Sequence, residues 1–207
     1  MLEIGCGTGN YIIDLSKLVS GNNYFGFDIS DEMLNIAKSR SNVVEFKIGD
    51  AEKVFPYGSS CFNCAFAVDV IHHIVNIENF FKETARCLKP KCSFLLVTDL
   101  ENNIKNRSLS KFFPEILQVE LDRYPTFESL KKFSLKSGLF LDKIIKAEGY
   151  REIDDEFIEK VKRKCSSSMR LISNEAHSLG IERLIIAQKN REKWFSTYSI
   201  LKFEKLT

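Results

Sequence analysis

The chain has 207 residues, of which 44% are hydrophobic and 28% charged, and its formal net charge is +2. A chain of this length can bury a sizeable core and is expected to fold as one α/β domain. The composition excludes a small disulfide-bonded framework, and no apolar run reaches the roughly 18 residues of a membrane span. We therefore expect a cytoplasmic protein with reduced thiols.

Charge is distributed unevenly along the chain. Residues 1–100 have 9 basic and 12 acidic side chains, whereas residues 101–207 have 21 and 16. An anionic substrate would suit the second half, but the basic run 160–164 is more typical of a solvated helix face. The small overall charge argues against a dedicated nucleic-acid-binding protein.

The first ten residues have the pattern of a strand, a glycine turn and the start of a helix. Gly5, Gly7 and Gly9 give the turn the spacing G-x-G-x-G. Glycine takes positive φ without strain and lets a ligand approach the backbone, and the N–H groups at the start of a helix favour negative charge. Glu3 would offer a carboxylate to a positively charged ligand group, and Cys6 stands where a small side chain is enough.

The next two strands end in acidic residues. The second predicted strand, 24–28, ends at Asp28, 19 residues after Gly9. That distance is close to the spacing of about 20 expected for an acid that binds ribose hydroxyls. The third strand is followed by Asp50 and Ala51, where a carboxylate could accept a hydrogen bond from an adenine amino group.

A helix is predicted to begin at Ser30, a typical N-cap residue, with Asp31 and Glu32 in its first turn. Four apolar side chains of this helix are expected to face the core: Met33, Leu34, Ile36 and Ala37. Ile29 and Met33 are candidates for contact with an adenine ring, and Ile29, beside the ribose-binding acid, is the one we predict. A core position for both is the alternative.

The fourth strand, which begins at Phe62, is followed by the pair His72-His73. An imidazole at this edge could accept a proton from a substrate heteroatom, although capping of the next helix or simple packing is the alternative. That helix is predicted over 76–88, and the fifth strand over 93–98.

These five elements resemble, in order, the class I S-adenosylmethionine-dependent methyltransferases. The resemblance rests on Glu3 with the glycine turn, on the strand ends at Asp28 and Asp50, and on the His-His ending of the fourth strand. Lys91-Cys92 replaces the family's usual Gly-Gly, which affects the type of turn and not the fold. The resemblance implies a Rossmann-like α/β fold with a seven-stranded, mostly parallel sheet in the order 3-2-1-4-5-7-6.

The resemblance also implies S-adenosylmethionine as the cofactor and direct methyl transfer to a small-molecule acceptor. Positioning can supply much of the rate of such a displacement, and a general base is needed only for a protonated acceptor. His72 and His73 are the candidate catalytic residues. The predicted cofactor-binding residues are Glu3, Gly5, Cys6, Gly7, Gly9, Asp28, Ile29, Asp50, Ala51 and Val68.

Three other functions stay open. A nicotinamide-binding unit also begins with a glycine turn, but Asn10 stands in place of its third glycine and Asp50-Ala51 argues against it. The segment 67–74 also resembles that of wobble-uridine tRNA methyltransferases, which would make a tRNA base the acceptor. A protein that binds S-adenosylmethionine without turnover would have the same fold.

Two cysteine pairs, Cys61-x-x-Cys64 and Cys87-x4-Cys92, could form the halves of a zinc site near the amino ends of strands four and five. Cys64 also fits an inward-facing strand position. We therefore predict no metal.

The second half is less regular. A helix with a glycine stop is predicted over 127–138, strand six over 139–147, and an antiparallel last strand over 195–203. Between these strands lies a helical insertion, 149–190. Because strand six is expected to run parallel to the first five, this insertion should leave on the cofactor side and form a lid. Candidate substrate-binding residues are Phe112, Phe113, Tyr124, Met169 and Arg170.

The chain starts at the strand expected in the middle of the sheet. Its four residues, at about 3.3 Å each, would reach only about 13 Å. Members of the family usually have a helix before this strand that closes over the methionine end of the cofactor. We therefore expect residues 1–207 to be a single methyltransferase domain that is N-terminally truncated, unless the insertion replaces that helix.

Overall fold

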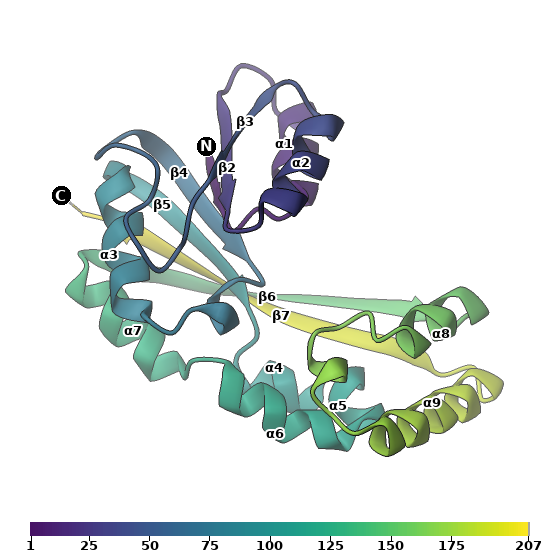
Figure 1. Ribbon diagram of the computed structural model, residues 1–207. Coiled ribbons are helices and arrows are strands. Elements are labelled where there is room, and N and C mark those ends of the chain that lie inside the picture. The colour runs from purple at the N-terminus through teal and green to yellow at the C-terminus, as the bar shows by residue number, and fades with distance from the viewer. Residues whose placement is uncertain (207) are drawn as a thin grey trace. The chain divides into compact units, whose positions relative to one another are not determined.

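A computed structural model describes residues 1–206. Within these residues seven strands form one sheet in the order β3-β2-β1-β4-β5-β7-β6 (Figure 1). The predicted fold class and strand order are therefore confirmed. The strands are β1 (Leu2–Ile4), β2 (Tyr24–Asp28), β3 (Val44–Ile48), β4 (Phe62–Val68), β5 (Leu88–Thr98), β6 (Leu139–Glu152) and β7 (Lys193–Lys205).

Helices connect the strands, as right-handed crossovers between parallel strands require. They are α1 (Asn10–Leu18), α2 (Asp31–Arg40), α3 (Ile77–Cys87), α4 (Glu101–Asn106), α5 (Ser108–Phe112), α6 (Pro114–Arg123), α7 (Phe127–Lys136), α8 (Asp155–Lys162) and α9 (Asn174–Lys189), with 3₁₀ turns η1 (Ile71–His73) and η2 (Ser168–Arg170). None of the helices within residues 1–206 is both long and apolar enough to cross a membrane.

Parallel pairing places the ends of the central strands at one edge. Ile4, the last residue of β1, lies opposite Phe27 of β2 and Ala67 of β4. The glycine turn after β1, Asp28 at the end of β2 and Val68 at the end of β4 therefore share the carboxyl edge of the sheet. In Figure 1 the arrow of β7 points opposite to that of β6, so the predicted antiparallel last strand is also observed.

The chain packs as two compact units. Unit 1 comprises Met1–Thr98, Phe127–Ile145 and the last strand from Ile200 onward, and unit 2 comprises Asp99–Thr126 and Lys146–Ser199. The strands β6 and β7 thus contribute residues to both units. All the predicted cofactor-binding residues belong to unit 1.

Helices cover both faces of the sheet in unit 1. In Figure 1, α3 and α7 lie on one side, and α1 and α2 lie on the other side, against β1 to β3. The α3 side is aromatic: the ring of Phe94 on β5 lies 5.9 Å from that of Phe80 on α3 and stacks at 5.9 Å on Phe203 of β7. These side chains are fully buried, so apolar packing stabilises the sheet that positions the strand ends.

Helix α2 begins as predicted, because the Ser30 hydroxyl accepts a hydrogen bond from the Met33 N–H. Its buried face is narrower than predicted. Leu34 and Ala37 are fully buried, whereas Met33 and Ile36 are 48% and 50% exposed. The expectation that Met33 and Ile36 face the core was therefore wrong, since only one stripe of this helix contacts the sheet.

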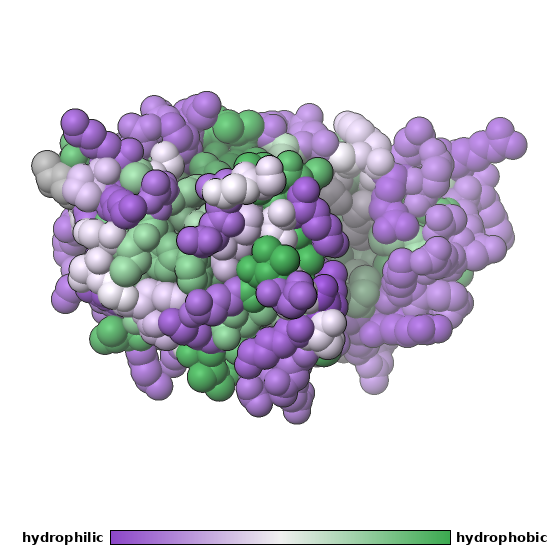
Figure 2. Space-filling model, turned by 90° about the horizontal axis from the view of Figure 1, so that it is seen from above, coloured by the Kyte–Doolittle hydropathy of each residue, from purple (hydrophilic) through white to green (hydrophobic). Residues whose placement is uncertain are grey.

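Several other apolar side chains of unit 1 also reach the surface. Leu18 at the end of α1 is 79% exposed, and Val54, in the loop after β3, is 75% exposed. Figure 2 shows such hydrophobic side chains, in green, among the hydrophilic ones on the face seen from above.

Unit 2 has an apolar core of its own, which lies between its helices. Phe113 is fully buried there and packs against Gly180 of α9, where a Cβ atom would lie 2.0 Å from the phenyl ring. The unit also buries charges: Arg107 donates to the carboxylates of Asp99 and Glu120, and all three side chains are at least nine-tenths buried.

The insertion between the last two strands is shorter than predicted at its start. Strand β6 continues to Glu152 instead of ending at Ala147, and β7 begins at Lys193. The residues between them form α8, η2 and α9, so helices follow strand six as expected. Gly138, with φ +77°, follows α7 as the predicted glycine stop.

Candidate functional site

The turn after β1 requires glycine. Gly5, Gly7 and Gly9 have φ values of +68°, +51° and +76°, a region that residues with a Cβ atom rarely adopt. A Cβ atom on Gly5 would also lie 2.5 Å from a methyl group of Val70. Gly9 is the N-cap residue of α1, so the turn leads the chain directly into the helix N-terminus.

Asp28 fixes the conformation of this turn. One of its carboxylate oxygens accepts a hydrogen bond of 2.8 Å from the Gly7 N–H, and the other accepts one of 2.9 Å from the Ser30 N–H. A carboxylate can accept about four hydrogen bonds. Half-buried Asp28 therefore has acceptor capacity left for the hydroxyl groups of a ligand.

Glu3 lies beneath the turn and is only 1% exposed. Its Oε2 accepts a hydrogen bond of 3.0 Å from the Ile12 N–H in the first turn of α1. Burial, with a smaller contribution from the neighbouring Asp28, raises the pKa of Glu3 to about 8 against the lowering effect of that hydrogen bond. A cation brought to the turn would favour the ionised form of this carboxyl group and be bound by it.

Asp50 lies two residues beyond the end of β3, at the same edge. Its Oδ1 accepts a hydrogen bond of 2.9 Å from the Glu52 N–H, which lowers the pKa of Asp50, and its Oδ2 lies 3.2 Å from Lys53 Nζ. Ala51 beside it is half-buried. Ile29, which follows the strand end at Asp28, is 67% exposed and thus open to contact with a ligand.

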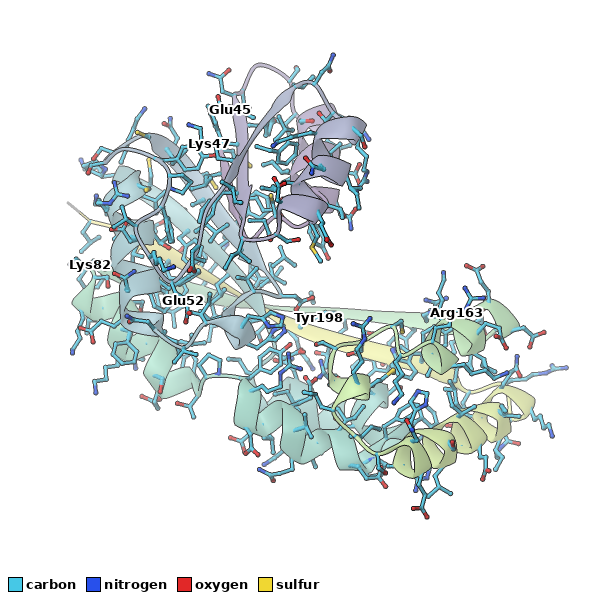
Figure 3. The ribbon with its side chains drawn as sticks, viewed as in Figure 1. Glu45, Lys47, Glu52, Lys82, Arg163 and Tyr198 are labelled. Carbon is cyan, nitrogen blue, oxygen red and sulfur yellow. The ribbon has the colours of Figure 1, made fainter. Side chains whose placement is uncertain are left out.

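Two contacts that support this edge could not be found in the sequence. Arg40 at the end of α2 donates to the Thr8 carbonyl at 2.8 Å and to Asn10 Oδ1 at 2.5 Å. Glu52, labelled in Figure 3, accepts from the backbone N–H groups of Val75 and Asn76 and so joins the loop after β3 to the start of α3. Each contact links segments more than 20 residues apart, and no local pattern marks such a pair.

The two histidines lie in η1, directly beyond the end of β4. Their ring centroids are 4.1 Å apart, with His72 half-buried and His73 exposed. Asp69, just before them, has a φ of +53°, which turns the chain sharply at the carboxyl edge. The pair is therefore close in sequence and space to the end of β4, and its part in catalysis stays a prediction.

Cys6 lies inside the turn and is 5% exposed. Burial raises the pKa of its thiol well above the usual range, and the nearby carboxyl groups of Glu3 and Asp28 add to this. The thiol therefore stays neutral and is a poor nucleophile. Within residues 1–206 no group of three or more His, Cys, Asp or Glu side chains is arranged to bind a metal ion.

The predicted substrate-binding residues all lie in unit 2. Phe112, Phe113 and Met169 are part of its apolar core and are at most 4% exposed. Tyr124 is half-buried and Arg170 is exposed. The structure thus groups the predicted cofactor residues at one edge of unit 1, whereas three of the five substrate candidates contribute to packing within unit 2.

Comparison with known proteins agrees with this geometry. Residues 2–96, which contain the glycine turn, the first four strands and most of β5, match a family described as a methyltransferase domain. This region therefore resembles a methyltransferase domain, and we use that name for it. The methyltransferase domain thus includes every predicted cofactor-binding residue.

Relatives of known name share the methyltransferase domain. The chain is 31% identical over 97 residues to the fatty-acid O-methyltransferase of Mycolicibacterium smegmatis. The aligned residues make up 46% of this chain and 35% of that protein. It is 30% identical over 157 residues to the demethylmenaquinone methyltransferase of Chlorobaculum parvum. That alignment covers 67% of this chain and 64% of that protein. The chain therefore spans between about a third and two thirds of the length of these relatives.

Solved structures share the fold of the whole chain. The YcgJ protein of Bacillus subtilis superimposes with a TM-score of 0.63 at 19% identity, over 100% of this chain and 91% of that one. The geranyl diphosphate C-methyltransferase of Streptomyces coelicolor, solved with S-adenosyl-L-homocysteine, gives a TM-score of 0.62 at 13% identity, over 99% of this chain and 70% of that one. The class I methyltransferase fold predicted from the sequence is confirmed.

Proposed function

We propose that the methyltransferase domain binds S-adenosylmethionine over the glycine turn and transfers its methyl group to a small-molecule acceptor. The observation that supports this most is the grouping of Asp28, Glu3 and the glycine turn at one sheet edge. Asp28 can accept hydrogen bonds from ribose hydroxyls, and the turn leaves room for a ligand at Gly7, where the nearest atom to an added Cβ is the Met33 sulfur at 3.5 Å.

The chemistry of Glu3 fits a cationic cofactor. A buried carboxyl group with a raised pKa is stabilised in its ionised form by a positive charge, and S-adenosylmethionine has both a sulfonium and an ammonium group. Asp50, whose pKa is lowered, is ionised at neutral pH and can accept a hydrogen bond from an adenine amino group. Ile29 has the exposed apolar surface that would pack on the adenine ring.

S-adenosylmethionine supplies an electrophilic methyl group, so the protein's own residues act mainly by positioning. The turn and Asp28 would orient the nucleoside, and Glu3 would orient the charged end. His72 and His73 would accept a proton where the acceptor arrives protonated. Such a role requires at least one neutral imidazole at the pH of the reaction.

Three observations support a small molecule as the acceptor. The named relatives are a fatty-acid and a demethylmenaquinone methyltransferase, and the ligand-bound structural neighbour is a geranyl diphosphate methyltransferase. The net charge of +2 is small for binding a nucleic acid. A tRNA base is therefore the weaker proposal.

Calorimetric titration with S-adenosylhomocysteine tests the cofactor site. Asp28→Asn should weaken binding at least tenfold, because each hydrogen bond to a charged group contributes about 1.5–3 kcal/mol. Asp31→Asn is the matched control, since Asp31 is exposed in the first turn of α2 and should leave the affinity unchanged. Equal affinity for both variants would reject the assignment of Asp28.

Turnover is a separate measurement. The protein is incubated with S-adenosylmethionine and candidate acceptors, and formation of S-adenosylhomocysteine is recorded. Acceptor-dependent formation identifies an enzyme. Tight cofactor binding without product for any acceptor would instead support a binding protein that retains the fold.

A further inference from the structure

The 3₁₀ turn η1, which contains His72 and His73, is held at both of its ends. Its front end is fixed to the sheet, because the Asp69 N–H donates a hydrogen bond of 3.1 Å to the Val97 carbonyl of β5. The turn itself is closed by a hydrogen bond of 2.9 Å from the His73 N–H to the Val70 carbonyl. Its back end leads into the start of α3, which is held by a residue of a different loop.

That residue is Glu52, in the loop after β3 (Figure 3). Its Oε1 accepts hydrogen bonds from the Val75 N–H and, at 3.0 Å, from the Asn76 N–H. Such hydrogen bonds are charge-assisted, and the helix dipole favours a carboxylate at this end. The Glu52 N–H in turn donates to the side chain of Asp50 at 2.9 Å. One residue therefore contacts the predicted adenine-binding acid with its backbone and the end of the histidine turn with its side chain.

This contact takes the place of half of a helix capping box. In a capping box the side chain at position N3 accepts the N–H of the N-cap residue. The N-cap of α3 is Asn76, and its side chain accepts the Asn79 N–H at 3.1 Å. The Asn79 side chain, at N3, instead donates to the carbonyls of Glu52 and Lys53, at 2.8 and 3.2 Å. The start of α3 and the loop 50–53 thus exchange hydrogen bonds in both directions.

The Glu52 contact is the part of this connection that is open to solvent. Farther along the loop the chain is fixed in the core: Phe55 is 2% exposed, and its N–H donates to the buried carboxylate of Glu83 at 2.9 Å. Glu52 is half-buried, and the two N–H groups that it accepts belong to exposed residues. Local opening costs least where hydrogen bonds are exposed to solvent. A ligand that orders the loop at Asp50 would therefore stabilise the Glu52 contact.

We propose that Glu52 is a positioning residue that couples the adenine end of the cofactor site to the histidine pair. The inference rests on the proposed function and adds the residue that holds its two parts together. An adenine bound at Asp50 orders the loop 50–53, Glu52 then holds the start of α3, and η1 takes up one position with His72 and His73. Because coupling between two sites is reciprocal, loss of Glu52 should also weaken the binding of the nucleoside.

Capping of α3 does not by itself account for Glu52. The helix already has the side chain of Asn76 as its cap and the acidic Glu78 in its first turn. Glu78 pairs with Lys136 of α7 at 3.4 Å. Glu78→Gln is therefore the matched control, since it removes a carboxylate from the same helix N-terminus and leaves Glu52 in place.

The probe is adenosine, which has the nucleoside and lacks the methionine end of the cofactor. The chain has three histidines, so their imidazole resonances can be followed singly by NMR after each is assigned by substitution. Saturating adenosine should shift the resonances of His72 and His73 in the wild type and in Glu78→Gln. His177, which is buried in unit 2, should keep its position. Glu52→Ala should lose both shifts at saturation and bind adenosine about fivefold more weakly or worse.

Glu52→Gln is the conservative variant. It keeps the length of the side chain and an acceptor oxygen but not the charge, so it should restore part of the shifts and part of the affinity. Melting temperatures check that the variants are folded. Where Glu52→Ala does not fold, Glu52→Gln takes its place, and its shifts should be smaller than those of Glu78→Gln.

Three outcomes would overturn the inference while the cofactor site stands. Shifts in Glu52→Ala equal to those of the wild type would show that adenosine acts on the histidines directly. Adenosine that binds the wild type without shifting His72 or His73 would show that the sites are not coupled. A shift shared by His177 would report a change of the whole chain. Failure of the proposed function is different: the wild type would then bind neither adenosine nor S-adenosylhomocysteine, and the coupling would fall with it.

Discussion

Glu3 in unit 1 and the carboxyl pair of unit 2 are buried in opposite ways. In unit 1, Glu3 is buried beneath the glycine turn, its hydrogen bond comes from the backbone of Ile12, and its pKa is raised to about 8. In unit 2, Asp99 and Glu120 are buried around the guanidinium of Arg107, which both contact. A buried acid paired within its own chain stabilises a fold, whereas one without a paired cation suits a site where a ligand brings the charge.

The largest effect should come from Arg107→Met. Removing the central cation leaves two carboxylates in the interior, and breaking a buried ion pair from one side costs about 3–5 kcal/mol. Urea unfolding measures the loss of stability. Arg163→Met is the control, because Arg163 is exposed in the same unit, is labelled in Figure 3, and should change stability by less than about 0.5 kcal/mol.

Hydrogen exchange of the Arg107→Met protein shows which unit loses stability. Protection should fall in peptides from 99–126, which contain all three members of the ion network, and stay near the native level in 1–98. An equal fall in both regions would show that the two units unfold together and have one common stability.

Gly5→Ala should have the next largest effect, in unit 1. The substitution places a Cβ atom 2.5 Å from Val70 at a φ of +68°, and left-handed backbone and overpacking together cost roughly 2–4 kcal/mol. Gly21→Ala is the control, because φ there is +83° but no atom lies within 4 Å of the new Cβ. Thermal unfolding of both variants separates steric overlap from backbone strain; equal losses would show that overlap at Val70 is relieved without cost.

The pH dependence of stability tests Glu3. Between its ordinary pKa of 4.5 and about 8, the folded protein keeps a proton that the unfolded chain has released, so stability should fall as pH rises through this range. Glu3→Gln removes that dependence. The free energy of unfolding of the variant, relative to that of the wild type, should therefore rise by up to about 1.4 kcal/mol per pH unit.

Glu45→Gln, on the exposed side of β3, is the control for this titration. Chemical unfolding at pH 5, 6.5 and 8 gives the difference in free energy of unfolding between each variant and the wild type at each pH. The same Glu3→Gln protein should bind S-adenosylmethionine more weakly, so stability and affinity move in opposite directions. A difference that is constant with pH would show that Glu3 is ionised in the free protein.

Ser30→Ala should have the smallest effect. The hydroxyl caps α2 by accepting the Met33 N–H, and loss of such a cap costs about 1 kcal/mol. Ser39→Ala, in the last turn of the same helix, removes an exposed hydroxyl that only donates back to the Ile36 carbonyl. Thermal unfolding should give a lower melting temperature for Ser30→Ala than for Ser39→Ala. A larger decrease for Ser39→Ala would contradict the assigned cap.

Most of the fold of unit 1 could be predicted because its signals are local. Glycine spacing, acids at strand ends and the Ser30 cap each occupy a few consecutive residues, and together they determine the order of strands and the shared edge. The function of Asp28 was predicted as ribose binding, but its hydrogen bond to Gly7 was not, since it joins positions 21 residues apart.

Unit 2 was less predictable for two physical reasons. Helices α4 and α5 have six and five residues, too few to show a helical period in the sequence. Its ion network also joins Arg107 to acids 8 and 13 positions away, and charged residues in a sequence are normally assigned to the surface. Aromatic residues such as Phe113 were therefore assigned to a substrate chamber, although Phe113 is fully buried against Gly180.

The place of β7 beside β5 has a consequence for how the chain folds. Thr98 ends β5 and Lys193 begins β7, so the neighbour of β5 follows 95 positions later. During synthesis the first five strands emerge while that edge still has free N–H and C=O groups, and all of unit 2 must be made before it is closed. Such distant pairing slows folding, and an open edge can pair with another chain, so β5 is exposed to intermolecular pairing until β7 has been made.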